Sequence, residues 1–474
     1  MESDKRRYYV KCADDTCPFK LHFNFRKNNF KAPNIKIPHT CHQQRSHPPS
    51  VSFLLNDEDV KSWFDIVKRD ATVKDLKNVL SRKGITPEQH IMKRCIQKLK
   101  SNYFVDDKEQ FKYLDSYVES MILKGHFAVL EKNGENFLRL CILYLEGIQS
   151  FGYYYERGMQ LDATFIKNAS GGTLMVSCFK DGNNNIKIIG IAVVSTENEE
   201  NWTWFLQNVK DKIGQQPSWI ISDRDRGLQN AVQIFDVFHA FCFRLNVLEN
   251  FHLRFKNKSL KEKAWGLAKA KTTIEFNRIA QWMNHINPEA MAWIEDIGLE
   301  RLAIAFSPPG ICRYGTVTSN NVESINSRLR SIRKLPIMEM LINIEEMVAL
   351  DRFSAARNSV SWNGQLTKYG ETFIRRHVKS SETFTCFQLS ENIFRITCPG
   401  PLQSINQVDI ENGGSCTCGG FKTYKFPCEH MIYVFRQNDI NVSDFVCDTW
   451  KKDTYCEANR RQGQVGQVTL LENL

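Results

Sequence analysis

The stretch Met159-Gln-Leu-Asp-Ala-Thr-Phe165 decides the fold, because its apolar and polar residues alternate with a period of two. That alternation predicts a β-strand with one buried face. Two more strand-like runs follow, residues 173–179 and 186–194, and the turn-rich segment Asp181-Gly-Asn-Asn-Asn185 separates them. Three consecutive strands joined by short turns predict an antiparallel meander.

Two helices and two further strands are expected after this meander. Asn201 is predicted to cap a helix that continues to Val209, and residues 227–235 are predicted to form the second helix. Residues 219–221 and 237–243 are short apolar runs typical of buried strands. The resulting order β-β-β-α-β-α-β resembles that of ribonuclease H-like domains, so we expect an α/β fold of this kind.

Three acidic residues stand at matching points of this expected core. Asp162 lies on the polar face of the first strand, and Asp223 ends the strand in Ser218-Trp-Ile-Ile-Ser-Asp-Arg-Asp-Arg-Gly227. Glu323 opens a helix in Thr318-Ser-Asn-Asn-Val-Glu-Ser-Ile-Asn326. Carboxylates are natural ligands of Mg²⁺ or Mn²⁺, and two such ions can hold both oxygens of a displacement at phosphorus. We predict that the three acids form a catalytic site for phosphodiester chemistry.

A cysteine and histidine cluster near the carboxyl terminus predicts a zinc site. Cys416-Thr-Cys418 is followed, after nine residues, by Cys428-Glu-His430. Three thiolates and one imidazole make a closed tetrahedral Zn²⁺ site, which is structural. We expect Cys416, Cys418, Cys428 and His430 to fold a small module that touches DNA or protein.

The amino terminus carries a second cluster with zinc-like spacing. Cys12 and Cys17 are followed by His39 and Cys41, and the fourth ligand could be Cys41 or the adjacent His42; we favour Cys41. Basic and aromatic residues alternate between the two pairs. This pattern suits contact with the DNA backbone.

Composition limits the possible classes of protein. The chain has 474 residues and a net charge of +10, and residues 1–45 hold ten Lys or Arg against four Asp or Glu. This basic segment favours a polyanionic partner, although a solvated basic face remains the alternative. The polar start and the lack of a long apolar run predict a soluble, intracellular protein without a membrane span. Its fifteen cysteines are then expected to be reduced, which favours metal binding over disulfides.

The expected domain boundaries follow from changes in the sequence pattern. Lys/Arg-rich helices predicted after Pro48-Pro49 could form a helix-turn-helix that reads DNA or a linker bundle. In chain order we expect a zinc module at 1–45, a helical region at 54–125, a catalytic domain at 137–360 with an all-helical insertion at about 252–312, a strand-rich segment at 383–436 with a zinc finger at 412–436, and a carboxy-terminal tail at 437–474.

Together these motifs resemble the Mutator-like element (MULE) transposases over most of the chain. The stretch Tyr9-Val-Lys-Cys-Ala-Asp-Asp-Thr-Cys-Pro-Phe19, with His39-Thr-Cys41, is similar to the family's WRKY-like amino-terminal zinc module. The three acidic stretches, with Gly227-Leu228 after the second, resemble the blocks of the DDE catalytic core. The segment from Cys416 to His430 resembles the SWIM zinc finger that closes many of these proteins.

The resemblance implies a mechanism, partners and a location. Water cuts the DNA strand at the element end, and the freed 3′-hydroxyl then attacks target DNA, with Mg²⁺ or Mn²⁺ as catalytic metal. Asp162 and Asp223 bridge or flank the metals, and Glu323 completes the site. The amino-terminal module reads the terminal inverted repeats. The protein is expected to act in the nucleus on double-stranded DNA, as a homo-oligomer, with two structural zinc sites.

One feature departs from the family pattern. The family usually follows its second acid with His, then Cys three positions on, then a second His three positions further. His239 and Cys242 fit, but Leu245 occupies the last place, and His252 is the nearest substitute. His239 and Cys242 are therefore secondary site candidates, and a satisfied core histidine is the other interpretation of His239.

Alternative functions remain open at the level of sequence. The first hypothesis is an active DNA transposase, which the three acids favour. The second is a domesticated, catalytically inactive DNA-binding transcriptional regulator. A decayed genomic copy and a metal-dependent nuclease outside transposition are further alternatives.

Overall fold

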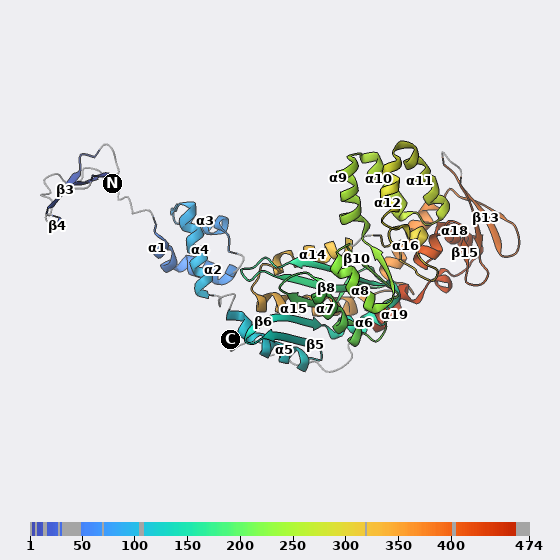
Figure 1. Ribbon diagram of the computed structural model, residues 1–474, viewed down its shortest axis with the longest axis horizontal. Helices are drawn as coiled ribbons and strands as arrows, with labels where there is room; N and C mark the ends of the chain where they lie inside the picture. Colours follow the sequence, from blue (N-terminus) through green and yellow to red (C-terminus); the bar gives the residue numbers. More distant parts are fainter. Residues whose placement is uncertain are drawn as a thin grey trace. The chain divides into compact units, whose positions relative to one another are not determined.

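The computed structural model describes residues 2–4, 7–12, 17–26, 29–30, 49–68, 71–103, 109–317, 320–400 and 404–460. Within these ranges it does not describe the side chains of residues 101–103, 244–246, 320–323 and most of the amino-terminal strands. The chain divides into two compact units, residues 1–106 and 107–474 (Figure 1). Among the described helices, none is both long and apolar enough to cross a lipid bilayer.

The first unit holds a small sheet and a helical bundle. Its described strands, β1 (Glu2–Asp4), β2 (Arg7–Lys11), β3 (Lys20–Arg26) and β4 (Asn29–Phe30), pair antiparallel in that order. The bundle consists of α1 (Val51–Asn56), α2 (Glu58–Val67), α3 (Val73–Ser81) and α4 (Gln89–Tyr103). These helices bury one apolar core that includes Leu54, Val60, Phe64, Leu76, Leu80 and Ile96.

The second unit is built on a mixed sheet whose described strands follow the order β11-β10-β7-β8-β9-β6-β5. They are β5 (Phe127–Asn133), β6 (Asn136–Leu143), β7 (Met159–Phe165), β8 (Thr173–Lys180), β9 (Ile186–Val194), β10 (Trp219–Ser222) and β11 (Phe238–Phe241). β7, β8 and β9 pair antiparallel, which confirms the predicted meander. β10 runs parallel to β7, and β11 runs parallel to β10.

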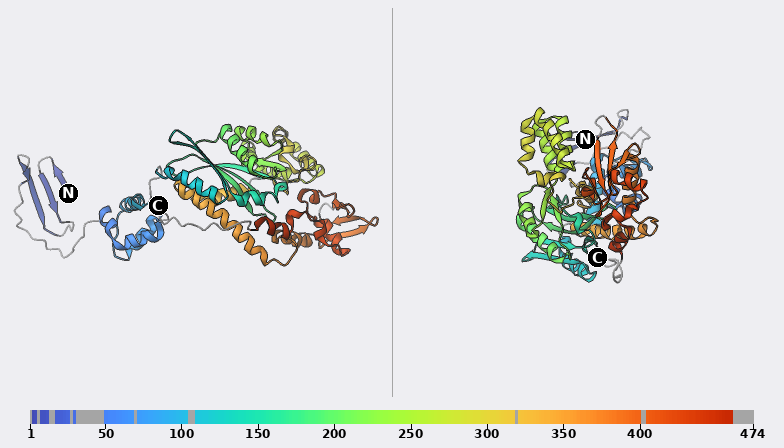
Figure 2. Two further views of the ribbon diagram at one scale, coloured as in Figure 1. Left: turned by 90° about the horizontal axis from the view of Figure 1, so that it is seen from below. Right: turned by 90° about the vertical axis from the view of Figure 1, so that its right-hand side faces the viewer.

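Helices cover both faces of this sheet. Leu161 and other residues of one face pack against α7 (Glu199–Lys212) and α8 (Arg226–Val232). The opposite face packs against α14 (Asn320–Ile332) and α15 (Ile337–Val360), through residues such as Val176 and Ile325. Figure 2 shows the long α15, drawn in orange, running along the sheet. Because successive strand residues point to opposite faces, Asp162 lies on the α14 side while Leu161 lies on the α7 side.

Two local predictions were wrong. Helix α7 begins at Glu199 and its cap is Asn198, whose side chain accepts a hydrogen bond from the backbone N–H of Asn201 at 2.9 Å. Asn201 instead lies inside the first turn, because a cap must precede the helix to reach its free N–H groups. The catalytic domain was expected to begin at residue 137, but the sheet already includes β5, which begins at Phe127 and pairs with β6 at its edge.

A helical segment lies between β11 and α14. Its helices are α9 (Glu249–Phe255), α10 (Lys258–Lys269), α11 (Thr273–Ile286), α12 (Pro288–Glu295) and α13 (Leu299–Leu302). They bury a core of their own, which includes Phe251, Leu260, Leu267, Met283 and Met291. Asn257 and Thr272 cap α10 and α11, and Pro288 occupies the start of α12, so local sequence signals set these boundaries.

The carboxy-terminal part joins a second small sheet to several helices. The sheet order is β12-β13-β14-β15, formed by β12 (Thr385–Gln388), β13 (Ile393–Cys398), β14 (Ser404–Asp409) and β15 (Ser415–Cys416) among the described residues. It is preceded by α16 (Lys368–Ser380) and followed by α17 (Gly420–Tyr424) and α18 (Glu429–Gln437). The chain then folds on to α19 (Lys452–Asn459), whose Tyr455 packs on Trp362.

Candidate active site and zinc centre

Asp162 and Asp223 lie at matching positions of neighbouring strands. In the parallel pair of β10 and β7, Ile220 stands opposite Met159 and Ile221 opposite Gln160. Continuing that register by two residues places Asp223, directly after β10, opposite Asp162. Neighbouring strands lie about 4.8 Å apart, so the two carboxylates come close together at the carboxyl end of β10.

The negative charge of Asp223 acts on Asp162. The pKa of Asp162 is raised to about 7, first because the group is buried and second because Asp223 adds a nearby negative charge. Burial also raises the pKa of Glu197, and Asp223 and Asp225 raise it further. Repulsion among neighbouring carboxylates that are partly shielded from water, as Asp162 and Asp223 are, is costly unless a proton or a cation compensates it. The donor set therefore fits a hard divalent cation.

Helix α14 contributes to the same site. Asn326 Nδ2 donates a hydrogen bond to Asp162 Oδ2 at 2.7 Å, and this contact ties the helix to β7. Glu323 lies one helical turn before Asn326 in α14, and its side chain is outside the described part of the structure. Further along, Arg333 Nη1 donates to the carbonyl oxygen of Phe165 at 3.0 Å and to Thr164 Oγ1. The helix thus follows β7 from Asp162 towards its end.

The loop after β10 is held by its own side chains. Asp223 Oδ1 accepts a hydrogen bond from the backbone N–H of Asp225 at 3.1 Å. Asp225 in turn caps α8, because its Oδ1 accepts from the N–H of Leu228 at 3.0 Å. These bonds fix the direction in which the chain leaves the strand. Asp225 therefore has a structural task beside the site.

His239 and Cys242 lie against the strand that leads to Asp223. His239 Nε2 is 2.8 Å from Ser222 Oγ, and the N–H of Cys242 donates to the carbonyl oxygen of Ser222 at 2.8 Å. Burial, assisted by Arg301, lowers the pKa of His239 to about 4, so its imidazole is neutral at physiological pH. His252, the substitute considered for the missing second histidine, lies in α9 of the helical segment.

The carboxy-terminal cluster forms a compact metal site. Cys416, Cys418, Cys428 and His430 each offer one ligand atom, and these atoms all lie within 4.8 Å of one another. Cys416 ends β15, Cys418 precedes α17, and Cys428 caps α18. The left-handed Gly419 (φ 71°) makes the turn between them, with the backbone of Lys271 too close for a side chain. The backbone N–H of Gly420 donates to Cys418 Sγ at 3.3 Å, which favours a thiolate.

His430 presents one ring nitrogen to this cluster and the other to a second set of groups. Nδ1 lies 3.7 Å from both Cys416 Sγ and Cys428 Sγ. Nε2 lies 3.1 Å from the side-chain amide of Asn406 and 3.2 Å from Cys398 Sγ. A histidine that binds metal through Nδ1 carries its proton on Nε2 and needs an acceptor there. Cys398 Sγ is one such acceptor, and the Asn406 amide, whose Nδ2 stands at this nitrogen, supplies a second once its nitrogen and oxygen are interchanged.

Comparison with known protein families finds two domain models that match this chain. Residues 159–246, which run from the first residue of β7 to the segment after β11, match the model of the MULE transposase domain. The chain carries a MULE transposase domain. Its match spans Asp162 and Asp223, together with His239 and Cys242. A search of curated proteins found no match to the chain.

A second family model accounts for the metal cluster beyond the MULE domain. Residues 406–438 match the SWIM zinc finger, and the match includes all four clustered ligands. The match also begins at Asn406, the partner of His430. The four clustered side chains therefore fit the zinc site of a SWIM finger.

The amino-terminal cluster is only partly within the described structure. Cys12 precedes the chain reversal to β3, and its N–H donates to the carbonyl oxygen of Phe19 at 3.1 Å. Cys17 is buried, with 8% of its surface exposed. His39, Cys41 and His42 lie outside the described residues, so the second zinc site stays a prediction.

Three contributors to these sites were missed by reasoning from sequence. Asn326 follows Glu323 by three residues, a spacing that marks one side of a helix and could have indicated it. Arg333 lies in a Lys/Arg-rich stretch without a distinguishing pattern. Asn406 precedes the first zinc-ligand pair on a different strand, and only the folded β13–β14–β15 sheet brings it to His430.

Proposed function

We propose that this chain is a DNA transposase of the Mutator-like class, a DDE-type enzyme that cleaves and joins DNA strands at terminal inverted repeats. The observation that carries this proposal is the closeness of Asp162, in β7, to Asp223, directly after the neighbouring parallel strand β10, within a MULE domain. An enzyme that cuts phosphodiesters with divalent metals needs convergent carboxylates of this kind.

The sheet supports the further proposal of a ribonuclease H-like core. Its strands β9-β8-β7-β10-β11 combine an antiparallel meander with two parallel strands on the far side of β7. Helix α7 connects β9 to β10, and α8 connects β10 to β11. We regard the helical segment before α14 as an insertion at about residues 252–312 into this core, and residues 1–45 as a WRKY-like module.

Each residue has a proposed task in the reaction. Asp162 and Asp223 hold the catalytic metals, and Glu323 completes the ligand set from α14. When bound, Mg²⁺ or Mn²⁺ supplies activation of the attacking oxygen and stabilisation of the leaving one. Asn326 keeps the Asp162 carboxylate turned towards the site by donating a hydrogen bond to Oδ2. His239, with Ser222, supports the end of β10 from the neighbouring strand.

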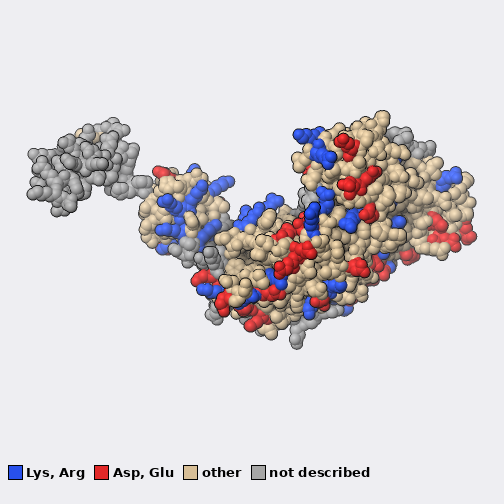
Figure 3. Space-filling model, in the orientation of Figure 1, with Lys and Arg blue, Asp and Glu red and all other residues tan. Residues whose placement is uncertain are grey.

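DNA recognition is proposed to involve the first unit. Figure 3 shows Lys and Arg side chains gathered on the bundle of α1 to α4. They include exposed Lys74, Lys77, Lys93, Arg94 and Lys98. Such a surface suits contact with phosphates of double-stranded DNA. We place the protein in the nucleus, as a homo-oligomer on the two repeat ends and target DNA.

The test uses the full-length, zinc-loaded protein with duplex DNA that carries the element's own terminal repeats. Native protein should cut this DNA with Mg²⁺ or Mn²⁺, whereas Asp162→Asn and Asp223→Asn should bind it without cutting. Asp236→Asn is the matched control, because Asp236 is exposed and has a left-handed backbone (φ 50°) that asparagine tolerates. Cleavage that survives both active-site changes would refute the assignment. Binding by native protein without any cleavage would favour the transcriptional regulator.

A further inference from the structure

A cavity of about 590 Å³ opens beside α14, outside the proposed metal site. It lies between the β8–β9 turn, α14, the second half of α15 and the start of α16. Ser324, the residue after Glu323, and Arg328 line it from α14. Its volume is within the range of about 300–1,000 Å³ that is typical of ligand sites.

The wall of the cavity is rich in groups that recognise a nucleotide. Amides come from Asn184 and Asn358, and hydroxyls from Ser324 and Ser354. Trp362 and Tyr455, with ring centroids 4.8 Å apart, add an aromatic floor. Amides and hydroxyls can pair with base edges, and an apolar floor can support the face of a base.

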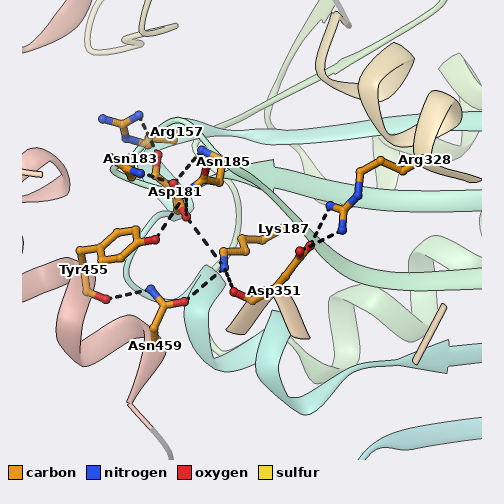
Figure 4. A network of polar contacts seen from close by, with 9 residues as sticks. All are labelled: Arg157, Asp181, Asn183, Asn185, Lys187, Arg328, Asp351, Tyr455 and Asn459. Carbon is orange, nitrogen blue, oxygen red and sulfur yellow. Dashed lines mark hydrogen bonds and ion pairs between the residues drawn. The ribbon is translucent and has the colours of Figure 1, made fainter. Parts of the chain in front are cut away.

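A buried polar network holds this wall in place (Figure 4). The Asp181 carboxylate accepts hydrogen bonds from the N–H groups of Asn183 and Asn185, and Lys187 Nζ lies 3.9 Å from it. Lys187 Nζ also donates to the carbonyl oxygen of Asp351 at 3.2 Å. The Asp351 carboxylate binds Arg328 through two hydrogen bonds of 2.7 and 2.8 Å. The β8–β9 turn, α14 and α15 are thus joined by charged contacts.

The charge balance of the cavity favours an anion. Arg328 and Asp351 neutralise each other, and Lys187 is paired with buried Asp181. Lys368 is different: in the described part of the chain, no carboxylate lies within ion-pair distance of it. Its ammonium lies 5.9 Å from the centre of the Trp362 ring, at the exposed rim. A phosphate at this position would be the missing counter-charge.

We propose that this cavity binds one nucleotide of a single DNA strand, with its phosphate at Lys368 and its base among the asparagine and serine side chains. This inference rests on the proposed function, because Ser324 lies two residues before Asn326, the α14 residue that contacts Asp162 of the proposed metal site. A free nucleotide offers the same phosphate and base, so the experiment must distinguish binding of a DNA strand from binding of a free nucleotide.

The test measures binding of a short fluorescent oligothymidylate to the full-length, zinc-loaded protein by anisotropy, without Mg²⁺ or Mn²⁺. Ser354→Phe fills the cavity and should weaken binding at least about tenfold. Ala349→Phe, an exposed change on the same helix away from the cavity, is its matched control. Lys368→Gln should weaken binding and reduce the salt dependence by about 0.7 in log–log slope, as expected for one lost phosphate contact. Lys379→Gln removes an exposed charge from the same helix, α16, and should change neither the affinity nor its salt dependence.

The possible results separate the sources and the two proposals. Equal binding by each variant and its control would overturn the inference. If Ser354→Phe does not fold, the comparison of Lys368→Gln with Lys379→Gln still tests it. If Ser354→Phe removes tight binding of thymidine monophosphate without changing binding of the oligonucleotide, that result would also overturn the assignment of the cavity to a DNA strand. Because the assay contains no catalytic metal, its result does not depend on whether the protein cleaves DNA. A failure of the cleavage test would therefore not change what this binding test shows.

Discussion

At the scale of single residues, the proposed active site depends on how its carboxylates are compensated. Burial and the like charges of Asp223 and Glu197 raise the pKa of Asp162, whereas the hydrogen bond from Asn326 lowers it. These opposing influences leave its pKa at about 7. Either a proton or a metal ion can therefore neutralise the Asp162 carboxylate. Its protonation depends on pH and on whether a metal ion is bound.

The first prediction concerns stability in the absence of divalent metal. Folding keeps a proton on Asp162 up to about pH 7, whereas the unfolded chain releases it near the ordinary value of 3.8. The stability gained from the proton is thus full below about pH 4 and lost as pH rises through about 7. The change amounts to at most about 4 kcal/mol. Melting temperatures of native protein and Asp162→Asn, measured across this range, should diverge; parallel curves would contradict the raised pKa.

The second prediction concerns Asn326. Asn326→Ala removes the donor to Asp162 Oδ2, so the carboxylate should hold metal less well. We expect a loss of roughly 10–100-fold in activity at limiting Mn²⁺, as is usual for partners of metal ligands. A titration of cleavage rate against Mn²⁺ measures it, with the exposed Ser327→Ala on the same helix as control. An unchanged Mn²⁺ dependence would exclude this role.

The third prediction concerns the zinc centre. Asn406→Ala removes the amide next to His430 Nε2 and should weaken zinc binding by roughly 10–100-fold. Competition with a colorimetric zinc chelator measures the affinity. Gln407→Ala changes the next, exposed side chain and should leave the affinity unchanged. If both variants retain native affinity, the amide does not orient the ligand.

At the scale of elements, short sequence signals mark the starts of several helices, and one of these signals was assigned to the wrong residue. Thr272 and Asn287 cap α11 and α12 as their residue types predict. For α7 both Asn198 and Asn201 have suitable side chains, and the local sequence does not choose between them. The choice is made by the loop from β9, which brings Asn198 to the free N–H groups of the first turn.

The fourth prediction tests this cap. Asn198→Ala should destabilise the first turn of α7 by about 1 kcal/mol, because the N–H of Asn201 loses its acceptor. Hydrogen exchange should then accelerate in the first turn and remain unchanged in the rest of the helix. Gln207→Ala, an exposed change later in α7, serves as control. Equal exchange in both variants would show that the cap contributes little.

At the scale of the whole second unit, the zinc finger contacts the segment that leads into the MULE domain. Lys425 Nζ binds Glu156 Oε2 at 2.7 Å, just before β7. The neighbouring Arg157 guanidinium lies between the rings of Tyr314 and Trp450, at 4.7 and 4.3 Å from their centres. The zinc finger is therefore part of the packing that supports the first strand of the site.

The fifth prediction follows from these contacts. Cys428→Ser removes one zinc ligand and should raise hydrogen exchange in the zinc finger and also in the segment that precedes β7. Cys386→Ser, at an exposed cysteine of β12, should change neither region. Exchange that rises only within residues 406–438 would mean that the finger folds independently of the MULE domain.

The sequence determined the features that repeat over short distances. The alternation in residues 159–165 and the turn at Asp181 predicted the meander, because strand period and turn chemistry are local properties. The spacing of Cys416, Cys418, Cys428 and His430 predicted the zinc centre for the same reason. β5 escaped prediction because its pattern is weak and its pairing with β6 at the sheet edge defines it.

Only the tertiary structure decided which distant groups meet. The register of β10 against β7 brings Asp223 opposite Asp162, and the packing of α14 brings Asn326 to the same carboxylate. Asn406 reaches His430 through sheet pairing, and the cavity beside α14 exists only where several elements adjoin. Such contacts depend on the packing of the whole core, and no local pattern of residues encodes that packing.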